Sequence, residues 1–154
     1  MVRTRTLTFA LALFTIAAFA QGQTPELDAL NGLYAGTVRF KIDRDRQLVI
    51  DQFDAKGLFR QDIVPIEYID PASMHFSAEE DAVILGCIAA QGQCFSKEIF
   101  KLNAIRRTGR CNLPPPSTDP LGEAMIQALR DLVDAEKQRM AAAGETRQGA
   151  SRMK

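Results

Sequence analysis

The stretch VRFKID, residues 38–43, decides the fold class because its apolar and polar side chains alternate without interruption. In an extended chain, Val38, Phe40 and Ile42 face one side, and Arg39 and Lys41 face the other. A period of two is typical of a β-strand with one buried and one solvated face. The chain around this stretch is therefore expected to form an antiparallel sheet.

Further segments rich in β-branched and aromatic residues follow, separated by turn signals. After the charged turn at 43–46 they cover 47–53, one or two strands within 58–69, then 73–76, the stretches before Cys87 and after Cys94, 102–105 and 110–113. Pro65 cannot donate to a sheet ladder, so it marks an edge or a bulge. Short strands at this spacing predict a single antiparallel β-sandwich or partly open barrel of about seven strands.

The period changes from two to 3.6 after the triple proline at 114–116. Asp119 as N-cap and Pro120 at the first helical position predict one C-terminal helix from Pro120 to about Ala142. Its apolar stripe consists of Leu121, Met125, Ile126, Leu129, Leu132 and Val133. We expect this helix to pack over an open end or face of the β-domain. The polar residues 143–154 predict a disordered tail.

The N-terminus has the pattern of a secretory signal peptide. Arg3 and Arg5 precede an apolar run over residues 7–20, which ends in the A-x-A pattern at 18–20. The run is too short for a membrane-spanning helix, which needs about 20 apolar residues. We therefore predict a signal peptide at 1–20, a leader at 21–32 and a folded domain at 33–142. The mature protein is expected in the periplasm or outside the cell, without a stable membrane anchor.

The predicted mature chain is long enough for one domain with a substantial core. Cleavage after Ala20 leaves 134 residues, with 17 basic and 19 acidic side chains and a formal charge of −2. This balance does not indicate a basic face, so nucleic acid is not an expected partner.

Cys87 and Cys94 flank the sequence IAAQGQ, and an exported chain would oxidise such a pair to a disulfide. The segments on both sides have strand character, and Gly92 suits a tight loop, so we expect a hairpin in which the two cysteines face each other. Opposed strand residues have Cα atoms about 4.5–5.5 Å apart, which a disulfide can bridge. The spacing fits neither a zinc site nor a C-x-x-C redox pair. Cys111 is left over, and pairings of Cys87 or Cys94 with it stay open.

The sequence indicates no catalytic residue, metal ligand or cofactor site. His75 lies between Met74 and Phe76, so it faces solvent if those two face the core. No serine or cysteine nucleophile can be matched to it, and no pair of carboxylates is singled out. We therefore do not expect an enzyme.

The densest basic cluster consists of Arg106, Arg107 and Arg110. Guanidinium groups bind anions well, so these residues are candidate contacts for an anion or a lipid headgroup. A solvated hairpin rim is the alternative interpretation.

Three segments together resemble small secreted bacterial proteins built on a pleckstrin-homology-like sandwich. They are IVPIEYIDPASMHF at 63–76, AVILGCIAAQGQCF at 82–95 and PLGEAMIQALRDLV at 120–133. The resemblance implies that fold and an interaction or binding role, without catalytic residues to carry over. The triple proline before the helix departs from the pattern.

These observations lead to a non-catalytic secreted or periplasmic binding module whose partner is a protein or a small molecule. The alternative is a lipocalin-like carrier of a small apolar ligand. Residues 31–34, NGLY, resemble the Gly-x-Trp start of lipocalins, with Tyr34 in place of the tryptophan. A filled core would favour the first hypothesis, and a hollow core the second.

Overall fold

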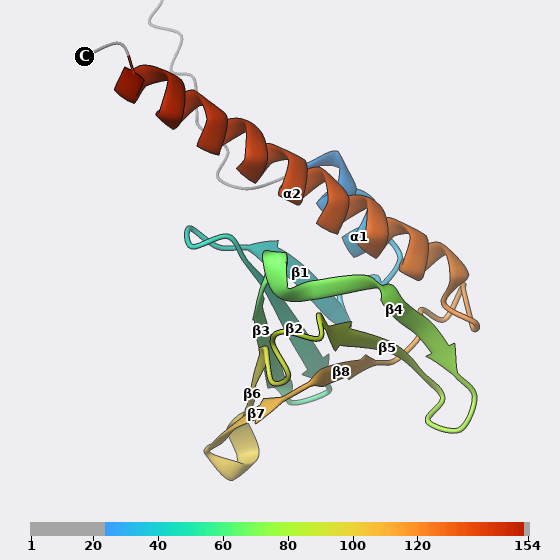
Figure 1. The fold of residues 1–154 in the computed structure, drawn as a ribbon. Coiled ribbons are helices and arrows are strands. Elements are labelled where there is room, and N and C mark those ends of the chain that lie inside the picture. The colour runs from blue at the N-terminus through green and yellow to red at the C-terminus, as the bar shows by residue number, and fades with distance from the viewer. Residues whose placement is uncertain (1–23, 153–154) are drawn as a thin grey trace, which may run out of the picture.

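A computed structural model of the protein describes the backbone of residues 24–152 and the side chains of residues 24–144. The predicted signal peptide lies outside the described residues. Two α-helices, α1 (Pro25–Gly32) and α2 (Glu123–Arg152), flank eight strands in this part of the chain (Figure 1). The strands are β1 (Val38–Ile42), β2 (Gln47–Asp54), β3 (Gly57–Pro65), β4 (Ile69–Ser77), β5 (Ala82–Cys87), β6 (Phe95–Ile99), β7 (Ala104–Thr108) and β8 (Arg110–Leu113), with short 3₁₀ turns η1 (Ile66–Tyr68) and η2 (Phe100–Leu102).

The strands form two antiparallel sheets, which confirms the predicted fold class. One sheet has the order β1-β2-β3-β6-β7 and the other the order β4-β5-β8. The chain passes between the sheets three times, after β3, after β5 and after β7, and the sheets do not close into a barrel. Helix α1 contacts β1, and α2 contacts both α1 and β4. The two helices thus cover the open side between the free edges of β1 and β4 (Figure 1).

A single hydrophobic cluster fills the space between the sheets and the helices. Its fully buried large side chains include Leu30, Phe40, Leu48, Ile50, Ile66, Ile69, Leu85, Phe95, Leu113, Met125, Leu129 and Leu132. Burial of each such side chain stabilises the folded state by roughly 1.5–3 kcal/mol relative to leaving it exposed to water. Both helices and every strand except β7 contribute to this cluster, so the helices and sheets are expected to fold as one unit.

The start of α2 differs from the prediction by three residues. Asp119 does cap the helix, because its carboxylate accepts hydrogen bonds from the main-chain N–H groups of Glu123 and Met125, both at 3.0 Å. However, residues 120–122 form a turn, and Leu121 is exposed instead of joining the apolar stripe. Gly122 has φ +65°, and a Cβ there would lie 2.3 Å from Val83, so only glycine fits this entry to the helix.

The other end of α2 also lies beyond the predicted boundary. The helix continues to Arg152, through most of the residues assigned to the tail. The buried stripe is otherwise as predicted, since Met125, Leu129, Leu132 and Val133 are fully buried.

The Cys87–Cys94 disulfide is present, with Cα atoms 5.8 Å apart, but the predicted hairpin around it is wrong. Strand β5 pairs with β4 and β8, whereas β6 pairs with β3 and β7. The main-chain N–H of Cys87 donates to the Gly109 carbonyl, and that of Ile88 donates to the Tyr68 carbonyl. These longer-range partners separate β5 from β6, so the disulfide joins two sheets rather than two neighbouring strands.

Candidate functional site

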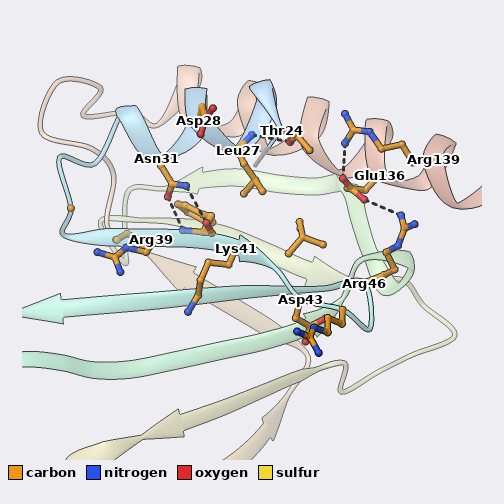
Figure 2. Close-up of a pocket in the computed structure, with 15 residues that line it drawn as sticks. Thr24, Leu27, Asp28, Asn31, Arg39, Lys41, Asp43, Arg46, Glu136 and Arg139 are labelled. Carbon is orange, nitrogen blue, oxygen red and sulfur yellow. Dashed lines mark hydrogen bonds and ion pairs between the residues drawn. The ribbon is translucent and has the colours of Figure 1, made fainter. Parts of the chain in front are cut away.

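An open groove of about 890 Å³ lies between α1, β1, the turn after β1, and α2 (Figure 2). Its apolar part comes from Leu27 of α1 and from Val38, Phe40 and Ile42 of β1. The first three are almost fully buried, whereas Ile42 is partly exposed at the groove. The alternation that identified β1 in the sequence therefore also places apolar side chains along the groove floor.

Asn31 fixes α1 beside the outer edge of β1. Its side-chain amide donates to the Phe40 carbonyl at 3.0 Å, and its carbonyl accepts from the Phe40 N–H at 2.7 Å. The Thr24 hydroxyl accepts a hydrogen bond from the Leu27 N–H at the N-terminus of this helix. The asparagine side chain thus takes the place of one residue of a neighbouring strand. It provides hydrogen-bond partners for the main-chain N–H and carbonyl of Phe40 at this sheet edge.

Helix α1 lies within the segment 21–32, which was predicted as a leader. Two signals in the sequence indicate more, namely a Thr24-Pro25 helix start and the apolar pair Leu27 and Leu30 at a spacing of three. Both leucines are buried against the core. Residues 24–32 therefore belong to the folded domain and form one wall of the groove.

A network of charged side chains closes one end of the groove (Figure 2). The carboxylate of Glu136 is nearly buried and pairs with Arg139 at 2.5 Å and with Arg46 at 3.4 Å. Arg139 also binds Glu26 of α1 at 3.0 Å. The hydrogen bond from Arg139 lowers the pKa of Glu26, and the two carboxylates raise the pKa of Arg139.

The turn between β1 and β2 holds two arginines beside the groove. Asp43 organises this turn, because its carboxylate accepts from the N–H groups of Asp45 and Gln47, both at 2.9 Å. The Arg44 side chain is exposed and has no hydrogen bond or ion pair with any described residue, and Arg46 has only its 3.4 Å contact with Glu136. Most of their guanidinium donors therefore have no partner among the described residues and are candidates for binding a ligand.

Both turn arginines also border a second, smaller hollow of about 310 Å³. Its opposite wall belongs to α2 and includes Met140 and Gly144. Arg44 and Arg46 thus line both hollows. Both side chains are exposed to solvent.

The remaining cations along the groove already have partners. Arg39 lies over the ring of Phe53, with 5.2 Å between the guanidinium carbon and the ring centroid. Lys41 pairs with the buried carboxylate of Asp51 at 2.6 Å. These two side chains lie on the solvent face of the sheet, so Arg44 and Arg46 carry the most available positive charge.

The structure does not gather the three predicted anion-contact residues into one cluster. Arg106 and Arg107 are successive residues of β7, so their side chains point to opposite faces of the sheet. Arg110 lies in β8 and pairs with Glu80 at 2.7 Å. An anion contact at these residues stays a prediction.

His75, Cys111 and Tyr34 lie in different surroundings. His75 is exposed, and its Nδ1 lies 2.8 Å from the Ser73 carbonyl. Cys111 is fully buried, and burial together with nearby Asp62 raises the pKa of its thiol, so it stays protonated. Burial also raises the pKa of the Tyr34 hydroxyl, which donates to the Pro114 carbonyl at 2.8 Å.

No group of three or more His, Cys, Asp or Glu side chains within the described residues is arranged to hold a metal ion. Over the same part of the chain, neither helix combines the length and the apolar character needed to cross a membrane. No protein-family model matches the sequence, and comparisons with curated proteins and with solved structures give no significant match.

Proposed function

We propose that this protein is a non-catalytic binding module that acts outside the cytoplasm, with the groove between α1, β1 and α2 as its ligand site. The observation that carries the proposal is the position of Arg44 and Arg46. Their guanidinium groups are largely unpartnered beside the partly exposed Ile42. Unpaired arginines next to an open hollow favour ligand binding, because an anion there would gain charge-assisted hydrogen bonds.

The ligand class that fits this groove is a small anion with an apolar portion. A carboxylate or phosphate matches the planar donor fork of arginine. An attached alkyl or aryl group would lie against Ile42, the partly exposed apolar side chain of the groove. Glu136 pairs with Arg46, so a ligand that brings a further, separate anionic group to that end of the groove would be repelled.

The proposed location rests on the N-terminal sequence and on the disulfide. A basic start, a short apolar run and an A-x-A end are typical of a signal peptide, and the Cys87–Cys94 bond fits an oxidising compartment. Expressed with its own leader in a bacterium, the protein is expected in the periplasm with Gln21 as its first residue. N-terminal sequencing of an uncleaved, cytoplasmic product would contradict this location.

The lipocalin-like carrier is the weaker candidate. A carrier of that kind holds its ligand inside the barrel, whereas here Leu85, Phe95, Leu113 and their neighbours fill the space between the sheets. We also propose that the protein is related to the small secreted proteins with a pleckstrin-homology-like sandwich. Two antiparallel sheets with a C-terminal helix are compatible with it.

Calorimetric titration of the purified protein with decyl phosphate, below its micelle concentration, tests the proposed site. Arg44→Ala and Arg46→Ala should each weaken binding about tenfold, since a hydrogen bond to a charged group contributes roughly 1.5–3 kcal/mol. Arg106→Ala is the matched control, because it removes one arginine from β7, outside the groove. Inorganic phosphate and decanol as separate ligands should each bind more weakly than decyl phosphate.

Two results would contradict the proposal. One is unchanged affinity in both the Arg44 and the Arg46 variants. The other is equal loss of affinity in the Arg106 control, which would place the anion contact at the basic cluster of β7.

A further inference from the structure

One end of the molecule carries an exposed apolar tip formed by Phe100, Leu102 and Ile105, with Leu58 beside it. These are four of the five large hydrophobic side chains that are exposed among the described residues, and Leu102 and Ile105 are 63% and 68% exposed. Isolated exposed apolar residues are common, but a group of them at one place marks an interaction surface. The tip is therefore a candidate contact region separate from the groove.

The backbone brings these residues together through two neighbouring loops. Turn η2 joins β6 to β7, where Ile99 pairs with Ala104, and it contacts β3. Lys101 of η2 binds Asp54 at the β2–β3 turn, with 3.2 Å between the ammonium nitrogen and the carboxylate. In Figure 1, η2 is the short yellow helix at the end of the molecule opposite α2. The tip is thus a protruding loop and not the wall of a groove.

Basic side chains surround the tip. Lys56, Lys101, Arg106 and Arg107 come from the same loops and from β7, and all four are exposed. The carboxylates in these segments are Asp54, which binds Lys101, and Glu98 of β6. The surroundings of the apolar tip therefore carry an excess of positive charge, which complements an anionic surface.

We propose that this tip docks the protein onto an anionic lipid surface. A protruding loop can insert Phe100, Leu102 and Ile105 into the interfacial region of a bilayer, while the neighbouring basic residues contact acidic headgroups. A second copy of the chain fits less well, because pairing two tips would bring the same four cations together. The proposal is independent of the groove, since the tip and the β1–β2 turn belong to different parts of the sheet.

Co-sedimentation of the purified protein with vesicles tests this docking. The protein should bind vesicles of phosphatidylcholine with about 30 mol % phosphatidylglycerol, and should bind pure phosphatidylcholine at least about tenfold more weakly. The double variant Leu102→Ser with Ile105→Ser should lose about tenfold or more in affinity for the anionic vesicles. Raising the salt concentration to about 0.5 M should also weaken binding, because salt screens the headgroup charge.

Leu121→Ser is the matched control, since Leu121 is also an exposed leucine, but it precedes α2. It should bind vesicles as the unmodified protein does. Circular dichroism melting checks that each variant folds. Three results would overturn the proposal: no binding to anionic vesicles, an equal loss in Leu121→Ser, or a concentration-dependent dimer that the tip variant abolishes.

Discussion

Cys87 and Cys94 connect the two sheets of the molecule through their disulfide. Cys87 is the last residue of β5 in the three-stranded sheet, and Cys94 immediately precedes β6 in the five-stranded sheet. The main-chain N–H of Cys94 also points at the Cys87 sulfur, at 3.0 Å. The bond therefore restrains how the sheets pack on each other, at a position remote from the groove residues.

Removal of this disulfide should destabilise the fold without altering the groove. Cys87→Ala with Cys94→Ala should lower the free energy of unfolding by about 2–4 kcal/mol, the usual effect of a native bridge. Denaturant unfolding measures the loss, and decyl phosphate affinity should stay unchanged. Peptide mapping without reductant should find the same Cys87–Cys94 link in a Cys111→Ala variant. A link to Cys111 in the unmodified protein would contradict the structure.

The docking of α2 can be tested at Leu129, which is fully buried in the core. Leu129→Asp places a charge among apolar side chains and should unfold the domain or lower its stability by more than about 3 kcal/mol. Asp131→Ala is the control, because Asp131 is exposed on the same helix and accepts a hydrogen bond from the Gln127 side chain. Equal melting temperatures for the two variants would show that the helix does not pack on the sheets.

The Asn31 bridge should hold α1 on the edge of β1. Asn31→Ala removes the hydrogen-bond partners of the Phe40 N–H and of the Phe40 carbonyl. It should lower the free energy of unfolding by about 1–3 kcal/mol. Asn31→Asp keeps an acceptor for the Phe40 N–H but places a carboxylate against the Phe40 carbonyl, so it should also destabilise. Asp28→Ala, on the exposed side of the same helix, should have a smaller effect in the same unfolding assay. Hydrogen exchange at Phe40 should rise only in the Asn31 variants.

The Glu26–Arg139 pair predicts a pH dependence of stability. The Arg139 hydrogen bond lowers the pKa of Glu26 below its usual value near 4.5, so folding favours the carboxylate. Its contribution is present above pH 4.5 and is lost as the pH falls through the lower, folded-state pKa. Glu26→Gln should therefore lower stability at pH 7 by less than about 1 kcal/mol, and the difference should shrink below pH 4.5. Glu79→Gln, an exposed control, should show no such convergence in thermal melts.

Local patterns in the sequence were sufficient to predict the type of several elements, although the segment of α1 was assigned to a leader. The alternation at 38–43 corresponds to β1, and the stripe from Met125 to Val133 is the buried face of α2. These features depend on periodicity within one element, which the sequence displays directly. The one strand pairing that was predicted, a hairpin of the strands around Cys87 and Cys94, is wrong. The strands β5 and β6 are neighbours in the chain but form ladders with distant partners such as β8 and β3.

The groove could not be predicted from the sequence either. Glu136 interrupts the apolar stripe and suggests a solvated position, but the structure buries it against Arg46, which is 90 residues away. Arg44 and Arg46 belong to a charged turn that is indistinguishable from a solvated loop until α1 and α2 are placed beside it. Tertiary contacts, and not residue types, therefore decide which of the basic residues border a hollow.

Amide and methyl NMR spectra recorded during a titration with decyl phosphate test the central claim most directly. The account predicts that signals of Ile42, Arg44 and Arg46 shift in a saturable manner, whereas those of Leu85 and Phe95 in the filled core and of Arg106 and Arg107 on β7 stay in place. Saturable shifts centred on the core residues would indicate an interior ligand instead. Shifts centred on Arg106 and Arg107 would move the anion site to β7, and either result would contradict the groove as the binding site.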